Sequence, residues 1–307
     1  MTLTELRYIV AVAREKHFGR AAEACFVSQP TLSVAIKKLE EELDVKIFER
    51  GANEVSVTPL GDEIVRQAQS VIEQAAAIKD IAKRGKDPIS GPLRLGIIYT
   101  IGPYLLPDLV KQAIERVPQM PLILQENFTV KLLEMLRTGE LDAAIMAEPF
   151  PDTGLAIAPL YDEPFMAAVP SAHPLAKRKS LTAEELKQET MLLLGTGHCF
   201  RDHVLEVCPE YARFSSNAEG IRKSFEGSSL ETIKYMVASG MGVTVVPQLS
   251  VPAEPQAHIK YIKFNAPVPT RRVVLAWRRT FTRYEAIAAL RNCIYACALP
   301  GVKRLTD

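Results

Sequence analysis

Residues 1–58 constrain the fold most, because three short amphipathic segments are followed by a hairpin pattern. Apolar side chains recur at helical spacing over residues 6–13, and a short alanine-rich helix is predicted over residues 18–25. Ser28 is a suitable N-cap for a third helix, with Pro30 tolerated in its first turn. Two segments of alternating apolar and polar residues then predict a β-hairpin. This order is typical of an all-α helix-turn-helix domain with a wing.

The third helix is the candidate reading element of this domain. The corresponding helix in such domains lies in the major groove, where polar and basic side chains reach base edges and phosphates. The predicted DNA-binding residues of this segment are Ser28, Gln29, Pro30, Thr31, Ser33 and Lys37. Charge supports this only weakly, because residues 1–86 hold 13 Lys or Arg and 13 Asp or Glu. A small helical packing module without nucleic acid is the alternative.

A long helix is predicted to follow over residues 59–88. Its apolar residues recur at alternating steps of three and four, as in a coiled-coil seam; they are Leu60, Ile64, Ala68, Val71, Ala75, Ile78 and Ala82. Directly after a helix-turn-helix, such a seam indicates a dimerisation helix, because dimers present two reading helices to a pseudo-palindromic site. The alternative is that the apolar stripe packs on its own domain.

Residues 89–307 alternate between short apolar strands and helices. Predicted strands include residues 93–98, 141–147, 191–194 and 259–264, with helices between them. Such alternation predicts an α/β domain with parallel-rich sheets, in which ligands bind at the C-terminal ends of strands.

Cys199 lies where this pattern predicts a functional site. It belongs to the run GTGHCFRD, which follows a predicted strand and begins a predicted helix. Free backbone N–H groups and the helix dipole favour a thiolate in a first helical turn, and His198 and Arg201 can add positive charge. We therefore expect an ionised thiol at this position.

Cys208 stands nine residues later and precedes Pro209, which discourages the helix from continuing. On one continuous helix the two Cα atoms would lie ~13.5 Å apart, whereas a disulfide tolerates at most ~7 Å. A bond between them requires the helix to unravel, so one interpretation of the pair is a redox switch. The alternative is two small buried residues without redox chemistry.

Other cysteines and histidines are assigned structural roles. Cys293 and Cys297 lie four apart on an apolar helix and are predicted to pack in the core. His203 is interpreted as a solvated helix residue, and its spacing from His198 does not match a metal-binding pair. The sequence indicates no metal site and no cofactor.

Composition places limits on the class of protein. The 307 residues are 48% hydrophobic and 24% charged, which is ordinary for a globular protein of more than one domain. Glu5 and Arg7 interrupt the N-terminus where a secretion signal would be apolar, and no segment is long and apolar enough to span a membrane. Five scattered cysteines do not form a secreted disulfide framework. We expect a cytoplasmic protein.

Over its whole length the chain resembles the LysR-type transcriptional regulators. The family's signature is matched by AAEACFVSQPTLSVAIKKLEEELDVKIFER over residues 21–50, by TPLG over residues 58–61 and by SGMGVTVVP over residues 239–247. Within the family, GTGHCFRD with a second cysteine at Cys208 is similar to the peroxide-sensing activators. Asn53 and Glu54 depart from the family, many members of which have arginine at the first of these positions, so Arg50 is predicted to be the phosphate contact of the wing.

The resemblance implies an organisation for the whole chain. The expected parts are a winged helix-turn-helix domain (1–58), a linker and dimerisation helix (59–88) and a regulatory domain (89–307). The regulatory domain is expected to have two lobes similar to periplasmic binding proteins, lobe I (89–161 and 269–307) and lobe II (162–268), joined by two crossing strands. The implied partners are double-stranded promoter DNA, three further copies of the chain in a homo-tetramer, and RNA polymerase.

The resemblance also implies roles in peroxide sensing. Cys199 would attack the peroxide and Cys208 would resolve the product, while the hydroxyls of Thr100 and Thr129, with His198 beside them, would hydrogen-bond the peroxide. Without the resemblance, the sequence favours a helix cap as the role of each threonine. The expected function is a peroxide-responsive DNA-binding regulator and not an enzyme. Two alternatives are a LysR-type regulator that binds a small metabolite between its lobes, and a thiol peroxidase.

Overall fold

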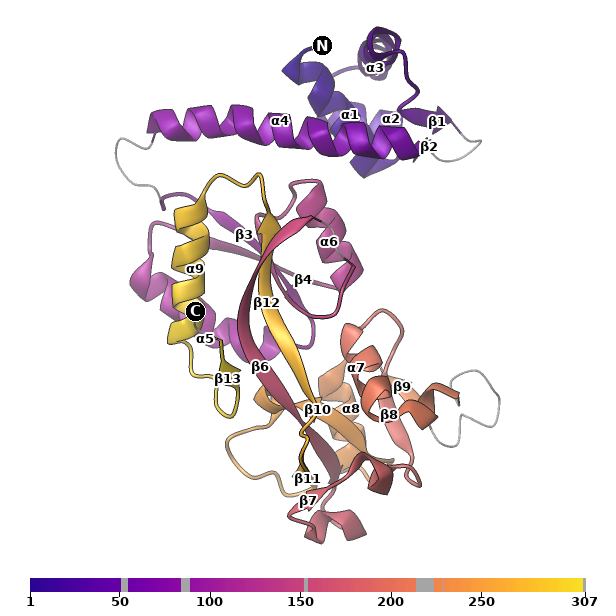
Figure 1. The fold of residues 1–307 in the computed structure, drawn as a ribbon, viewed down its shortest axis with the longest axis vertical. Helices are drawn as coiled ribbons and strands as arrows, with labels where there is room; N and C mark the ends of the chain where they lie inside the picture. The colour runs from indigo at the N-terminus through magenta and orange to yellow at the C-terminus, as the bar shows by residue number, and fades with distance from the viewer. Residues whose placement is uncertain (51–54, 84–88, 152–153, 214–223, 228, 306–307) are drawn as a thin grey trace.

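The computed structural model describes residues 1–50, 55–83, 89–151, 154–213, 224–227 and 229–305. The N-terminal domain and the long helix α4 lie at one end of the molecule, and the regulatory domain extends away from them (Figure 1). Within the described residues, none of the helices has both the length and the apolar character needed to cross a membrane.

The N-terminal domain has the predicted helix-turn-helix and hairpin. Its elements are α1 (Leu3–Glu15), α2 (Phe18–Ala24), α3 (Gln29–Leu43), β1 (Phe48–Arg50) and β2 (Val55–Val57). Ser28 caps α3 by accepting a hydrogen bond from the backbone N–H of Thr31 at 3.3 Å, and Pro30 lies in the first turn, as expected. Ile9 and Leu32 are fully buried in the core that these helices share.

Helix α4 (Pro59–Lys83) carries the predicted apolar stripe. One part of the stripe packs on its own domain, and other parts are exposed and available for dimerisation. Ala68 is buried against the helix-turn-helix core, and Ile64 and Val71 pack beside it. Leu60 and Ile78 are exposed. The middle of the stripe therefore packs on its own domain, whereas apolar side chains toward both ends are uncovered in the single chain.

Lobe I is built around a sheet in the order β4-β3-β5-β12, with β4, β3 and β5 parallel and β12 antiparallel to β5. Its elements are β3 (Leu93–Ile98), α5 (Gly102–Arg116), β4 (Leu122–Asn127), α6 (Thr129–Arg137), β5 (Ala143–Ala147), β12 (Thr270–Arg278), α9 (Tyr284–Ala296) and β13 (Lys303–Arg304). The apolar core of this lobe includes Leu95, Leu132 and Leu290.

Lobe II lies at the other end of the regulatory domain (Figure 1). Its elements are the second half of β6 (Leu155–Pro170), β7 (Ser180–Leu181), β8 (Met191–Leu194), α7 (Cys199–Val207), β9 (Ser224–Gly227), α8 (Leu230–Ala238), β10 (Thr244–Pro247) and β11 (Ile259–Phe264). Short 3-10 helices lie at Pro174–Lys177, Ala183–Leu186, Pro209–Arg213 and Gln248–Ser250.

Strand β6 joins the two lobes. Residues 155–164 pair with β12, and the following residues pair with β10 and β11. Two separate cores of buried residues lie on either side of this transition. Movement of one lobe against the other must therefore bend the chain near β6 and at the start of β12.

Several local elements differ from the prediction. Strands β4, β7, β9 and β13 and the first half of β6 were not predicted, and the helix expected after Thr182 is the 3-10 helix Ala183–Leu186. Strand β4 pairs with β3 alone and is largely exposed, so its sequence LILQEN lacks the apolar run of an interior strand. The capping box between Thr182 and Glu185 is present, but only one turn follows it.

Candidate thiol site and nucleic-acid interface

Cys199 is the first residue of α7, as predicted, and His198 is its N-cap residue. The turn from β8 into α7 requires Gly197, whose φ of +101° is rarely adopted by L-residues. A Cβ atom at Gly197 would also lie 3.4 Å from the ring of Phe128. This turn brings the half-buried Cys199 of lobe II against the core of lobe I.

The expectation of an ionised thiol at Cys199 is wrong for this state of the protein. Burial raises the pKa of Cys199, because an anion loses solvation there; the Thr129 hydroxyl and the charge of Arg271 lower the pKa, and Asp202 raises it. The effect of burial on the pKa is larger than the opposing effects of Thr129 and Arg271. The thiol is therefore protonated at neutral pH, although it has two neighbours that favour its anion.

A small cavity of about 10 Å³, partly open to solvent, adjoins the sulfur. It is lined by four residues that were predicted together: Thr100 at the end of β3, Thr129 at the start of α6, and His198 and Cys199 at the start of α7. A space of ~10–15 Å³ on this measure holds one water molecule. The cavity suits a molecule of very few atoms and excludes a metabolite of ordinary size at this position.

The hydroxyls of Thr100 and Thr129 do not cap helices. The N-cap positions of α5 and α6 are Ile101 and Phe128, so the alternative interpretation of both threonines is excluded. The Oγ1 atom of Thr129 is buried and has no hydrogen-bond partner of normal geometry among the described residues. A buried hydroxyl without a partner is unfavourable by roughly 1–3 kcal/mol. A small polar guest in the cavity would remove that cost.

Arg271 on β12 contacts the site and was not singled out from the sequence. Its guanidinium donates to Thr100 Oγ1 at 2.8 Å and to the Thr100 carbonyl at 2.9 Å, and it pairs with Glu163 at 2.8 Å. The side chains of Arg271 and Glu163 are 1% and 0% exposed. Arg271 therefore orients the Thr100 hydroxyl and supplies the positive charge that lowers the pKa of Cys199.

His198 and Arg201 lie where predicted, but their contacts differ from those expected. The imidazole of His198 packs edge-on against the rings of Phe128 and Tyr99, with centroids 4.8 and 5.8 Å away, and forms one wall of the cavity. Arg201 is buried and donates to the carbonyl of Leu194 at 3.0 Å, which ties α7 to the end of β8. The guanidinium that lowers the pKa of Cys199 is that of Arg271.

Cys208 occupies the opposite end of α7. It is the C-cap residue, is fully buried in the core of lobe II, and has a free thiol, as does Cys199. Burial raises the pKa of Cys208 to about 12. The two sulfurs thus lie in different environments at the two ends of one helix.

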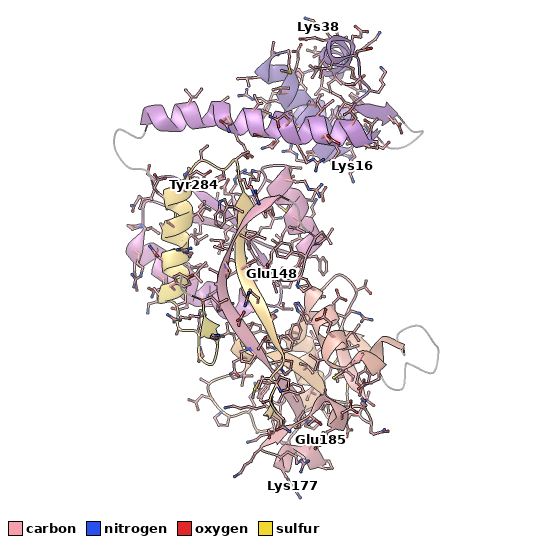
Figure 2. All side chains as sticks on the ribbon, in the orientation of Figure 1. Lys16, Lys38, Glu148, Lys177, Glu185 and Tyr284 are labelled. Atoms are coloured by element: carbon pink, nitrogen blue, oxygen red, sulfur yellow. The ribbon has the colours of Figure 1, made fainter. Side chains whose placement is uncertain are left out.

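His203 corrects a further prediction, because it is buried and not solvated. Its Nε2 atom lies 2.7 Å from the carbonyl oxygen of Glu148, a residue near the centre of the molecule (Figure 2). The sequence missed this burial because the contact joins residues 55 positions apart. It anchors the middle of α7 to lobe I.

The predicted reading surface on α3 is accessible. Gln29, Pro30, Thr31 and Lys37 are exposed and Ser33 is half-buried. Ser28 is exposed, and its hydroxyl lies 2.7 Å from that of Thr31. The labelled Lys38 marks the outer side of α3, away from α4 (Figure 2). The side chain of Arg50, together with Asn53 and Glu54, lies outside the described part of the chain.

Two family models together cover most of the chain. The bacterial regulatory helix-turn-helix protein model of the lysR family matches residues 3–62, and the LysR substrate binding domain model matches residues 86–297. The chain is 38% identical over 292 residues to the DNA-binding transcriptional dual regulator OxyR of Escherichia coli K12, covering 94% of each protein.

Solved structures give the same result. The chain is similar to full-length OxyR from Pseudomonas aeruginosa at 51% identity and a TM-score of 0.79, over 97% of this chain and 99% of that one. An H2O2-bound cysteine-to-serine mutant of Corynebacterium glutamicum OxyR matches at 34% identity and a TM-score of 0.63, over 96% of this chain and 92% of that one. The chain therefore belongs to the LysR family of DNA-binding transcriptional regulators.

Proposed function

We propose that this regulator senses hydrogen peroxide and is switched by oxidation of Cys199 followed by disulfide formation with Cys208. The observation that carries the proposal is the small cavity beside the Cys199 sulfur, to which lobe I contributes the hydroxyls of Thr100 and Thr129 and lobe II contributes His198 and Cys199. The relatives named hydrogen peroxide-inducible genes activator, and the H2O2-bound related structure, support the same signal.

The chemistry proceeds in two steps, a substitution at a peroxide oxygen and a condensation of two cysteines. The Cys199 sulfur attacks one peroxide oxygen, the O–O bond breaks, and the leaving oxygen takes the thiol proton to become water, which leaves a sulfenic acid. The Cys208 thiol then displaces hydroxide from that sulfur, and a second water forms. In total, one H2O2 is reduced to two waters and two thiols are oxidised to one disulfide.

The surroundings of Cys199 suit the first step. Because burial keeps the thiol protonated, it is protected from slow oxidants and alkylating agents. When peroxide occupies the cavity, Thr129 gains a partner, while Thr100 is already held in place by Arg271. His198 is proposed to close the cavity, and Arg201 to hold the turn that carries the sulfur.

The second step requires α7 to open. Cys199 begins α7 and Cys208 is its C-cap residue, and the ~13.5 Å between Cα atoms nine residues apart on a helix exceeds the limit for a disulfide. The helix contacts that must break are those of Arg201 with Leu194 and of His203 with Glu148. The bond therefore traps a conformation different from the one described.

Assembly and DNA contact complete the proposal. We propose that the exposed residues of α3, with Arg50 in the wing, contact promoter DNA, that the chain acts as a homo-tetramer, and that it communicates with RNA polymerase. The two separate cores support the lobe limits 89–161 with 269–307 and 162–268. The start of α4 directly after β2 supports a linker that begins at residue 59.

Two other functions are less well supported. A metabolite effector would need more room at the Thr100 and Thr129 position than the cavity offers. A thiol peroxidase would need a thiol that reacts repeatedly without a slow refolding step, and it gives no role to a helix-turn-helix that matches the lysR family.

The test is the state of all five cysteines before and after a short, dilute pulse of H2O2 on the full-length protein. Mass spectrometry should find the Cys199–Cys208 bond after the pulse, with the remaining three thiols reduced. A second expected result is that Lys37→Ala weakens DNA binding across sequences and reduces the salt slope by about one, while Thr31→Ala weakens specific binding alone. A peroxide pulse that leaves Cys199 reduced would overturn the sensing proposal.

A further inference from the structure

The carboxylate of Glu73, on the linker helix, contacts the regulatory domain. Its Oε2 atom accepts a hydrogen bond from Thr280 Oγ1 at 2.7 Å, and its Oε1 atom pairs with Arg278. Gln69, one turn earlier on α4, donates to the same Oε1 at 2.8 Å and thereby orients the carboxylate. The Glu73 and Arg278 side chains are only 13% and 9% exposed, so solvent screens this pair weakly.

The regulatory side of this contact is the end of two elements. Arg278, the last residue of β12, also donates to the carbonyls of Leu136 in α6 and of Leu141 just beyond it. Gly139, directly after α6, has φ +74°, and a Cβ atom there would lie 2.2 Å from the Gln69 amide nitrogen. The end of α6, the end of β12 and α4 are thus packed without space between them.

The opposite ends of the same two elements lie at the thiol site. Helix α6 begins at Thr129, in the cavity wall, and β12 carries Arg271 seven residues before Arg278. At the usual rise per residue, α6 spans ~12 Å and the β12 segment ~23 Å. The β12 segment has a register shift between Val273 and Val274, so it is an irregular connection, whereas α6 is a regular helix that transmits displacement with little internal bending. Figure 1 shows β12 running from the lobe boundary toward the side on which α4 lies.

We propose that the Glu73 contact with Arg278 and Thr280 is the coupling joint between the sensor and the DNA-binding end. The joint is closed in the described state, in which the cysteines are free thiols. Displacement of Thr129 or Arg271, when α7 opens, moves the far ends of α6 and β12 against α4 and breaks the joint. That oxidation of Cys199 provides the signal rests on the proposed function. The contact of Glu73 with Arg278 and Thr280 is independent of that proposal.

The joint behaves as a switch because its two partners are poorly solvated. Separating a largely buried carboxylate from its guanidinium removes the nearest compensating charge of each group, so small separations are strongly unfavourable. The stable arrangements are a closed joint and one in which both groups reach water. A discrete change of this kind alters the orientation of α4, and with it the spacing of the reading helices in an oligomer.

The test compares full-length Glu73→Gln with wild type in two readouts. The first is the rate of Cys199–Cys208 formation after an H2O2 pulse, measured by mass spectrometry. The second is the footprint of reduced and oxidised protein on an operator selected by the wild-type protein from random DNA. We expect Glu73→Gln to oxidise within about twofold of the wild-type rate, while its reduced footprint matches the oxidised one.

The controls separate coupling from simple loss of stability. Asp62→Asn removes the exposed 3.5 Å pair with Arg66 on the same helix and should leave both footprints as in wild type. Thr280→Val removes one hydrogen bond from the regulatory side and should shift the reduced footprint in the same direction; it decides the matter if Glu73→Gln fails to fold. A folded variant with a normal redox-dependent change of footprint would overturn the joint. Failure of wild type to form the disulfide would instead overturn the sensing proposal.

Discussion

Two pairs of cysteines in this chain differ in spacing and in environment, and environment is what distinguishes them. Cys293 and Cys297 lie four residues apart at the end of α9, where the Cys297 thiol donates to the Cys293 carbonyl at 3.2 Å. Cys199 and Cys208 lie at opposite ends of α7, too far apart to bond. Proximity alone would select the α9 pair as the redox pair.

The surroundings of each sulfur favour the α7 pair. Cys293 and Cys297 are 1% and 0% exposed within an apolar core, and burial raises the pKa of Cys297 to about 12. Cys199 adjoins a cavity and has Thr129 and Arg271 to stabilise its anion. A reactive thiol needs access and a neighbour that favours the thiolate. Only the α7 pair, of the two, offers such a sulfur.

The largest expected effect is that of Cys199→Ser. The variant should lose the peroxide response completely while it still binds its operator, because the nucleophilic sulfur is absent and the reading helix is untouched. A promoter reporter with and without H2O2 measures this loss. The matched control is Cys293→Ser, which should respond as wild type does. A peroxide response that is retained in Cys199→Ser, or lost in Cys293→Ser, would contradict the assignment of the redox role to the α7 pair.

A smaller effect is expected for Thr129→Val. Valine keeps the shape of threonine and removes a buried hydroxyl that has no partner in the described structure, so the free energy of unfolding should not fall and should rise by up to roughly 1–3 kcal/mol. Loss of one hydrogen bond to the reacting peroxide should slow oxidation of Cys199 about tenfold, equivalent to about 1.4 kcal/mol. Stopped-flow oxidation and thermal unfolding provide the two numbers. An unchanged oxidation rate would remove Thr129 from the site.

The pH dependence of alkylation should distinguish Cys199 from the other buried cysteines. Because burial raises the pKa of Cys199, its thiolate fraction should increase about tenfold per pH unit through neutrality, without a plateau below pH 8.5. Site-resolved labelling of reduced protein with iodoacetamide between pH 6 and pH 10 measures this. Cys208 and Cys297, with pKa values near 12, should label more slowly than Cys199 at every pH. A labelling rate for Cys199 that stops rising at or below pH 7 would show that the thiol is ionised at neutral pH, as predicted from the sequence.

The smallest effect concerns the α9 pair. Cys297→Ala removes one buried sulfur and should cost on the order of 1 kcal/mol, a shift in Tm of roughly 2–4 °C. The peroxide response should stay unchanged, since this thiol takes no part in the switch. Differential scanning fluorimetry and the promoter reporter test both statements. A variant with normal stability and an altered response would indicate redox chemistry in α9.

The helices that carry the functional residues could be predicted from the sequence where neighbouring residues alone determine them. Ser28, Pro30 and the apolar spacing that follows define α3, and the glycines before Cys199 place that residue in a first helical turn. The two threonines were placed through the family resemblance and not through a pattern of their own. The structure brings them together at the cavity.

The electrostatics of the site could not be predicted in the same way. The bond from Arg271 to Thr100 joins residues 171 positions apart, and the contact from His203 to Glu148 joins residues 55 apart. Neither arginine nor histidine has a local signal for such a partner. The sequence predicted an ionised Cys199 from its position in the helix, which is a local property. The thiol is instead protonated because burial raises its pKa, and that burial depends on packing against lobe I.

The central claim is that the Cys199–Cys208 bond forms only when α7 opens. Hydrogen exchange across residues 195–213, compared between reduced protein and protein shown by mass spectrometry to contain the bond, tests it directly. The account predicts that the amides of α7, protected in the reduced state, exchange far faster or with a new pattern after oxidation. Unchanged protection of residues 199–207 in a sample that contains the bond would contradict it.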